Sequence, residues 1–357
     1  MRVALSAPGK LLLIGEYAVL HGAPAVVMAV DRRARVELEP SGSELWSVTA
    51  PPLAAEPVRF TLAADGSLRW HGDPTAASGR IDLVERVIAS MVAAGLLDTA
   101  DLPPASATLD TRALFEDGEV GGMKLGLGSS AASTVGLASA LALWNGREEL
   151  LADRRRWLTS LLGLHRGLQG GRGSGVDLAA SLLGGVVDYR LDEHGAVATA
   201  QRLPMPEGLH LVVVWTGRAA DTGSMLRRLH ERLAAGDVAV EAALGRLAEL
   251  SSAGAEAFRR GRIATLLETV DAYCDAMEAL GSAAALPIVS AEHNTLRSLA
   301  HRNRSSYKPS GAGGGDLGIA FAAEPEAATA TAAAAAAAGF RTVPLRVDPS
   351  GLLIRHT

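Results

Sequence analysis

The feature that most constrains this chain is a glycine- and serine-rich segment, Gly126-Leu127-Gly128-Ser129-Ser130, placed directly before a long apolar run. The run from residue 131 to 144 predicts a helix in which Gly136 is the one helix breaker. Where such a loop opens a helix, unpaired backbone amides and the positive end of the helix dipole point at one spot. The segment therefore predicts a phosphate site of the kind that a nucleotide occupies.

Two more glycine-rich segments stand near the ends of the chain, at Pro8-Gly9-Lys10 and at Lys308 to Asp316. A tight turn with a helix cap explains one such loop but explains three poorly. No Gly-x-x-x-x-Gly-Lys-Ser/Thr sequence occurs, which excludes a P-loop enzyme on motif grounds. The spacing Gly126-x-Gly128-x-x-Ala131 fits a dinucleotide fingerprint only loosely, because the region near Glu148 is predicted to be helical.

Length and composition bound the remaining possibilities. A chain of 357 residues with 48% hydrophobic residues predicts two domains with substantial aliphatic cores, since aromatics are only 4%. The net charge of -5 argues against a general nucleic-acid or membrane-surface binder. Cys274 is the only cysteine, so an internal disulfide is excluded and a buried apolar role is expected.

Neither a signal peptide nor a membrane span is predicted. Pro8-Gly9-Lys10 interrupts the apolar residues at the N-terminus, and the alanine run 332–338 is bounded by Pro325 and Gly339, which favours an ordinary helix packed on a sheet. A cytoplasmic location is therefore expected.

The pattern of elements predicts an α+β chain. Apolar or alternating runs predict strands at residues 2–5, 11–14, 25–38, 107–114, 209–215, 317–321 and 340–347, with strand-like sequence over 45–70. Apolar periodicity predicts helices at 81–94, 131–144, 148–168, from 176 onward, over 222–303 in series, and at 325–338. Polar and proline residues between 188 and 208 suggest a boundary, giving an N-terminal domain at 1–200 and a C-terminal domain at 201–357.

Two charged residues beside the glycine-rich segments are candidates for catalysis. Asp177 fits either an acid stabilised by a helix N-terminus or a carboxylate that orients or deprotonates an attacking hydroxyl. Lys10 fits either a solvated lysine at a strand edge or a cation that neutralises a transferring phosphoryl group. For Asp316 a structural role in its turn is favoured. The nine histidines show no metal-ligand spacing, so bound zinc is not expected.

Taken together, the segments resemble the motifs of the GHMP kinase superfamily. Pro8 to Leu20 resembles the first motif, Gly126 to Ala132 the ATP loop and Ser310 to Asp316 the third motif, in the right order over nearly the full chain. The resemblance implies a two-domain fold: an N-terminal domain with a left-handed βαβ crossover, and a C-terminal ferredoxin-like domain.

The details are most similar to the phosphomevalonate kinase branch. Glu16-Tyr17 stands where galactokinases and mevalonate kinases usually carry Glu-His, and the stretch Leu114 to Gly118 before the ATP loop is similar to that branch. Mevalonate kinases carry a magnesium-binding glutamate eleven residues before the aspartate, and this chain has Arg166 there. A cation cannot ligate magnesium but suits a second phosphate, which favours a phosphorylated substrate.

The resemblance implies roles for individual residues. Lys10 and Asp177 are expected to be catalytic, and Ser130 is the expected protein ligand of Mg²⁺. The residues expected to bind ATP are Lys124, Gly126, Leu127, Gly128, Ser129, Ser130 and Ala131. Those expected to bind the substrate are Lys10, Tyr17, Ser174, Ser310, Ala312, Gly313 and Gly314.

The activity implied is ATP-dependent phosphorylation of 5-phosphomevalonate to 5-diphosphomevalonate, in the mevalonate route to isoprenoids. A mevalonate kinase or another small-molecule GHMP kinase is the alternative, and a non-catalytic ligand sensor on the same fold is a third possibility. The expected partners are a small-molecule substrate and no nucleic acid or membrane, with the chain a monomer or homodimer.

Overall fold

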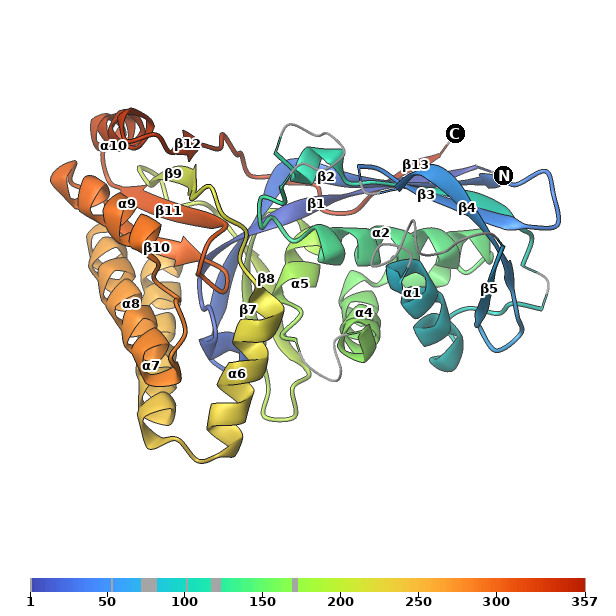
Figure 1. Cartoon of the computed structure of the whole chain (residues 1–357), viewed down its shortest axis with the longest axis horizontal. Coiled ribbons are helices and arrows are strands. Elements are labelled where there is room, and N and C mark those ends of the chain that lie inside the picture. Colours follow the sequence, from blue (N-terminus) through green and yellow to red (C-terminus); the bar gives the residue numbers. More distant parts are fainter. Residues whose placement is uncertain are drawn as a thin grey trace. The chain divides into compact units, whose positions relative to one another are not determined.

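The computed structural model describes residues 2–52, 54–71, 82–100, 102–116, 123–168 and 173–356. The chain forms two compact units that are not consecutive in sequence. Unit 1 contains Met1–Lys10, Ala29–Gly185 and Val347–Thr357, and unit 2 contains Leu11–Met28 and Val186–Arg346. Figure 1 shows the elements of both units.

Unit 1 is built on a sheet with strand order β13-β1-β2-β6-β3-β4-β5. The neighbours pair in antiparallel fashion at β13–β1 and β2–β6, whereas β3 runs parallel to β6, which requires a crossover connection. The bounds are β1 (Val3–Ile14), β2 (Ala25–Pro40), β3 (Trp46–Ala50), β4 (Ala54–Leu62), β5 (Leu68–His71), β6 (Ala105–Asp110) and β13 (Leu353–His356).

Helices of unit 1 cover one face of this sheet (Figure 1). Their bounds are α1 (Asp82–Ala93), α2 (Ser129–Trp144), α3 (Glu149–Ala152), α4 (Arg154–Leu168) and α5 (Val176–Leu183), with a 3-10 turn at Arg112–Leu114. In α2 every residue from Ala131 to Trp144 is buried. A Cβ atom at Gly136 would lie 2.7 Å from Val36 Cγ2, so this glycine lets α2 lie close against β2.

Unit 2 contains a second sheet with order β10-β11-β9-β12. Its strands are β9 (His210–Trp215), β10 (Ser306–Ser310), β11 (Leu317–Ala322) and β12 (Arg341–Thr342). Its helices are α6 (Thr222–Ala234), α7 (Val238–Arg259), α8 (Ile263–Ala284), α9 (Ala291–Arg302) and α10 (Pro325–Ala337), with a 3-10 turn at Ala18–His21. The helices follow β9 and β11, and the strand order matches a ferredoxin-like sheet, which confirms that expectation.

The core of unit 2 lies between its sheet and its helices. Val214 and Ala320 from the sheet pack with Leu296 and Ala300 of α9 and with Ala335 of α10. The alanine-rich α10 begins at Pro325 and is followed by Gly339, and it packs on β9 and β11 as expected. Cys274 is fully buried in α8, and burial raises the pKa of its thiol to about 12, so the expected apolar role is confirmed.

The first motif differs from its prediction because Pro8-Gly9-Lys10 does not interrupt the strand. β1 runs unbroken from Val3 to Ile14. A Cβ atom at Gly9 would lie 2.7 Å from Leu127 O. Glycine is therefore needed here because the strand approaches the backbone of the ATP loop closely, and not because the chain turns. The carbonyl of Pro8 accepts a hydrogen bond from Ser181 Oγ at 2.8 Å.

The polar region at 188–208 is a hairpin. Strands β7 (Val186–Leu191) and β8 (Val197–Leu203) pair with each other, and β7 also pairs with Ala25–Met28 of β2. Since β1 and β2 each run through both units, the compact units do not follow the order of the chain. A division into 1–200 and 201–357 stays a prediction.

Three further elements differ from the prediction. The helix expected over 148–168 is two helices, because Asp153 Oδ1 accepts from the backbone amides of Arg155 and Arg156 and so caps α4. Strand β10 lies over residues for which the sequence predicted no strand. The strand expected over 340–347 is limited to β12, and Val347 pairs with Val30 in unit 1. Within the described ranges, no helix is long and apolar enough to cross a membrane.

Candidate active site

Lys10 lies against the middle glycine-rich segment in unit 1. Its backbone amide donates to Leu127 O at 2.8 Å, and its Nζ donates to Gly126 O at 3.1 Å. The side chain is half-buried. An ammonium group has three N–H donors, so two remain for an anion. The first motif thus places a cation directly beside the predicted phosphate loop.

The loop has the backbone geometry that anion binding requires. Gly126 and Gly128 have φ of 73° and 75°, a region that side chains disfavour. Gly128 caps α2 without a side-chain hydrogen bond to the first turn. Ser129 is half-buried and Ser130 exposed, whereas Leu127 and Ala131 are buried. The amides of this first turn therefore stand at the positive end of a buried helix. Lys124, also predicted to bind ATP, has an exposed side chain and pairs through its backbone with Phe115.

Asp177 lies in the first turn of α5, also in unit 1. Its Oδ1 accepts from the Leu178 amide at 3.0 Å, and the residue is half-buried. Ser181, one turn further along the same face of α5, binds the carbonyl of Pro8. Pro8 and Lys10 are two residues apart in β1, so their side chains share a face of the strand. Both predicted catalytic residues thus lie in unit 1, where a hydrogen bond joins the helix that carries Asp177 to the strand that carries Lys10.

The loop before α5 is held by the arginine that stands in place of the glutamate. Arg166 Nε, in the last turn of α4, donates to Gly173 O at 3.1 Å. Ser174 Oγ accepts weakly from the Val176 amide at 3.4 Å, and Gly175 has φ of 74°. Residues 169–172 of the predicted loop lie outside the described residues, as do 117 and 118 of the stretch before the ATP loop.

In unit 2, the predicted substrate residues Tyr17, Ser310 and Ala312 bond to the protein itself. The Tyr17 hydroxyl donates a short hydrogen bond to Ala312 O, and Ser310 Oγ donates to Leu12 O at 3.0 Å. Burial, and then the neighbouring Glu16 charge, raise the pKa of Tyr17 far above its ordinary value. The tyrosine is therefore a neutral hydrogen-bond donor, and its part in substrate binding stays a prediction.

The third segment requires glycines because backbone atoms of other segments lie very close to it. Gly313 and Gly314 have φ of 73° and 75°, and the Gly314 amide donates to Ile288 O at 2.9 Å. A Cβ atom at Gly315 would lie 2.7 Å from Arg218 O. Asp316 Oδ1 accepts from the Ala220 amide at 3.1 Å, so its role in the turn is structural, as favoured from the sequence.

Sequence reasoning gave no role to an ion pair that lies beneath this segment. Lys308 Nζ lies 2.5 Å from Glu16 Oε1, and the two side chains are 0% and 1% exposed. Tyr273 also donates to Glu16 O at 2.7 Å. Lys308 is the one charged residue of its strand, but its partner is 292 residues away along the chain, so no local pattern indicates the pair.

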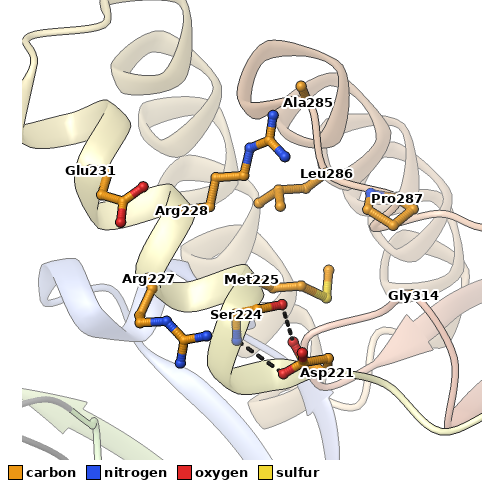
Figure 2. Close-up of a pocket in the computed structure, with 10 residues that line it drawn as sticks. All are labelled: Asp221, Ser224, Met225, Arg227, Arg228, Glu231, Ala285, Leu286, Pro287 and Gly314. Carbon is orange, nitrogen blue, oxygen red and sulfur yellow. Dashed lines mark hydrogen bonds between the residues drawn. The ribbon is translucent and has the colours of Figure 1, made fainter.

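A cavity of about 550 Å³ opens in unit 2 beside the third segment. Gly314 and Pro287 form one wall and α6 the other, with Arg228 extending from α6 toward Ala285 (Figure 2). Asp221 accepts from the Ser224 amide and so caps α6. The lining contains Arg227 and Arg228 but also the carboxylates of Asp221 and Glu231, so its charges balance and select no ligand.

The residues present fit Mg²⁺ in the manner typical of nucleotide enzymes. Ser130 offers an exposed hydroxyl on the first turn of α2, while its carbonyl accepts from Thr134 Oγ1 at 2.9 Å. In the part of the chain that the structure describes, no three His, Cys, Asp or Glu side chains cluster as a metal cage. Magnesium commonly binds one or two protein oxygens together with substrate phosphates.

Comparisons with known proteins found relatives that match most of the chain. A phosphomevalonate kinase of Streptomyces sp. (strain CL190) is 30% identical over 345 residues, covering 88% of each chain. A mevalonate kinase of Thermococcus onnurineus is 28% identical over 65% of this chain and 64% of that one. The structure of Streptococcus pneumoniae phosphomevalonate kinase, in complex with phosphomevalonate and AMPPNP, matches with a TM-score of 0.76 at 21% identity, covering 96% and 99% of the two chains.

No protein-family model matches the chain. The similarity to the Streptomyces enzyme nevertheless extends over most of both sequences, and the structural match extends over nearly the whole fold. The chain belongs to the phosphomevalonate kinase family, within the GHMP kinase superfamily.

Proposed function

We propose that this protein transfers the γ-phosphoryl group of ATP to the phosphate of 5-phosphomevalonate, giving 5-diphosphomevalonate and ADP. The observation that carries the proposal is Lys10, held by Leu127 and Gly126 beside the glycine-rich start of α2. It is supported by membership in the phosphomevalonate kinase family. ATP is the proposed co-substrate, and a cytoplasmic location is proposed with it.

The proposed reaction forms a bond between an acceptor phosphate oxygen and the γ-phosphorus and breaks the bond from that phosphorus to the β–γ bridging oxygen. The backbone amides at Gly128 to Ala131 would hold the ATP phosphates, and the Lys10 ammonium would donate to oxygens of the transferred group. Mg²⁺, when bound, would neutralise charge on the phosphates, with Ser130 as its protein ligand. Alignment and charge neutralisation supply the catalytic effect.

Because the proposed acceptor is a phosphate and not an alcohol, the reaction requires a different role of Asp177. A phosphate monoester has a second pKa near 6, so at pH 7 it is mostly a dianion without a proton to remove. Asp177, fixed at the start of α5 by its bond to the Leu178 amide, would therefore position neighbouring groups instead of acting as a strong general base. Its proposed role is the orientation of Lys10 and of the acceptor.

A mevalonate kinase is the second candidate, because a relative of that name is 28% identical. The observation against it is Arg166, which takes the place of the glutamate and donates to the carbonyl of Gly173. A neutral hydroxyl acceptor has no second dianion to neutralise, so a cation in place of an acid favours the phosphorylated substrate.

An ADP-release assay run side by side with phosphomevalonate, mevalonate and galactose tests the proposal. Phosphomevalonate is expected to give at least about a tenfold higher kcat/KM than mevalonate, equivalent to roughly 1.4 kcal/mol. Galactose serves as the unrelated acceptor and is expected to give no turnover. Equal or better use of mevalonate would overturn the assignment in favour of the second candidate.

A further inference from the structure

The third glycine-rich segment rests on residues of the first motif, and all of these contacts lie in unit 2. Leu12 O accepts from Ser310 Oγ at 3.0 Å and from Lys308 Nζ at 3.4 Å. Glu16 Oε1 accepts from Lys308 Nζ and from the Gly311 amide at 3.3 Å. Tyr17 then donates to Ala312 O. Three residues of the first motif, from Leu12 to Tyr17, thus bind the stretch from Lys308 to Ala312.

Lys308 is the one charged group of β10, whose five residues are all buried. Its ammonium donates to Glu16 Oε1 at 2.5 Å, to Pro309 O at 2.7 Å and to Leu12 O at 3.4 Å. Three acceptors match the three donors of an ammonium group. With 0% exposure, Lys308 is not accessible to a substrate, so its effect must pass through the groups that it holds.

Glu16 depends on Lys308 for its charge balance. Glu16 Oε2 is buried and has no hydrogen-bond partner among the described residues, and the carboxylate is 1% exposed. Removing one member of a buried ion pair leaves an uncompensated charge, which costs about 3–5 kcal/mol, whereas replacing both members by apolar groups is often neutral. A buried ion pair is therefore weak evidence that the pair stabilises the fold. The position of this pair beside the third segment needs a different explanation.

We propose that Lys308 is a positioning residue, which fixes the backbone of Ser310 to Gly314 through Glu16 for binding of the phosphorylated acceptor. This inference rests on the proposed function, in which the third segment binds the acceptor. The pair holds the Gly311 amide through Glu16 Oε1 and the Pro309 carbonyl through Lys308 Nζ, on the two sides of Ser310. One buried charge pair thus fixes the backbone immediately before and after Ser310, at the start of the segment.

The test compares Lys308→Met, Glu16→Gln and the double variant with the wild type. Each single variant is expected to melt at a lower temperature, and the double variant to recover most of that loss because it buries no unpaired charge. The KM for phosphomevalonate is expected to rise at least tenfold in Lys308→Met and to stay raised in the double variant. The KM for ATP is expected to stay within twofold in both.

Asp188→Asn with Arg259→Met is the control, because these residues form a second ion pair of unit 2, which is partly buried, with Arg259 Nε 2.9 Å from Asp188 Oδ2. It is expected to lower the melting temperature and to leave both KM values unchanged. If the acceptor KM instead recovers together with stability in the double variant, or if the control raises it equally, the pair is merely structural and the proposal is wrong.

Amide hydrogen exchange separates this inference from the proposed function, since it needs no substrate. Exchange in a peptide covering 306–316 is expected to become at least tenfold faster in the double variant but not in the control variant. Unchanged exchange would overturn the positioning role even if phosphomevalonate is the substrate. If the wild type turns over no phosphomevalonate but exchange still rises, the proposed function fails while the positioning role stands.

Discussion

At the scale of single residues, the chemistry proposed depends more on a cation than on a base. Lys10 Nζ uses one donor on Gly126 O and has two left for phosphate oxygens. Two highly charged phosphates must approach each other in the reaction, and a dianionic acceptor has no proton to lose near pH 7. Neutralisation of charge is therefore the requirement that is harder to meet.

Lys10→Ala is accordingly expected to reduce kcat at least as much as Asp177→Asn, when both are measured with saturating phosphomevalonate. The melting temperatures of both variants should stay near that of the wild type, which confirms that the fold is intact. An alcohol acceptor reverses the order, because its hydroxyl gains reactivity from a carboxylate. If Asp177→Asn is essentially inactive while Lys10→Ala keeps substantial activity, the proposed mechanism is wrong.

His293 gives a prediction for pH. Burial lowers its pKa from 6.5 to about 4, opposed in part by its hydrogen bond with Gly315 O. Gly315 O can only accept, so Nε2 carries the proton and Nδ1 accepts from Tyr307 Oη at 2.8 Å. Because the unfolded chain binds this proton more readily, the free energy of unfolding is expected to fall as pH drops from about 6.5 to 4, by roughly 3 kcal/mol.

Urea unfolding at a series of pH values measures this effect. His293→Gln keeps a donor for Gly315 but cannot take up a proton, so its free energy of unfolding should be lower at pH 7 yet depend less on pH between 6.5 and 4. Parallel pH profiles for the variant and the wild type would show that other groups cause the acid sensitivity.

At the scale of elements, the loop that opens α2 is the part whose function depends most on backbone geometry. Gly128 has φ of 75°, and a Cβ atom there would lie 2.9 Å from Lys10 Cγ. Gly128→Ala is therefore expected to strain the loop by about 1–3 kcal/mol and to displace Lys10. Both the KM for ATP and kcat should worsen, each by about tenfold. A thermal melt must show that α2 remains folded.

Ser130→Ala is the cleaner test of the same element. Thr134 binds the carbonyl of Ser130 and not its hydroxyl, and alanine is a good helix former, so α2 should keep its stability. Loss of the hydroxyl is expected to weaken ATP turnover, with a higher Mg²⁺ concentration needed for half-maximal rate. An unchanged Mg²⁺ titration would remove Ser130 from the proposed metal site.

The sequence predicted helices and strands well where neighbouring residues along the chain determine them. The helix after Gly128 was predicted from its glycine cap and its apolar run, and the ferredoxin-like order from the resemblance of the motifs. Gly9 was understood less well, because its need for close approach to Leu127 arises from a contact 118 residues away, which no local pattern encodes. The Lys308–Glu16 pair was missed for the same reason.

At the scale of the whole molecule, the chain's last residues belong to the unit that contains its first. β13 pairs with β1 through Val3↔His356 to Ser6↔Leu353. Arg33 forms a short ion pair with Asp348 and donates from Nη2 to Ser6 O at 2.6 Å and to Gly351 O at 2.5 Å. Arg154 donates to Leu352 O at 2.9 Å. Unit 1 is thus closed by the segment 347–357.

A fragment of residues 1–200 tests the predicted division at residue 200 against the discontinuous units. If residues 1–200 form an independent domain, that fragment should fold cooperatively by itself. We expect instead that it unfolds without a cooperative transition, because removing residues 347–357 leaves Arg33 half-buried without its partner and exposes an edge of β1. The measurement is thermal unfolding of the fragment followed by circular dichroism.

In the full chain, Asp348→Ala tests the contribution of the C-terminal segment to unit 1 without removing any residues. Asp348 also accepts from the amides of Ser350 and Gly351, so alanine removes the anchor of the C-terminal segment as well as the charge beside Arg33. The loss is expected to be about 3–5 kcal/mol in the free energy of unfolding, with the ends of β1 and β13 exchanging amide hydrogens first. Glu249→Ala, which removes only an exposed pair with Arg246, should cost less than about 1 kcal/mol. If fragment 1–200 folds cooperatively and Asp348→Ala costs no more than Glu249→Ala, the C-terminal segment is dispensable and the consecutive division is right.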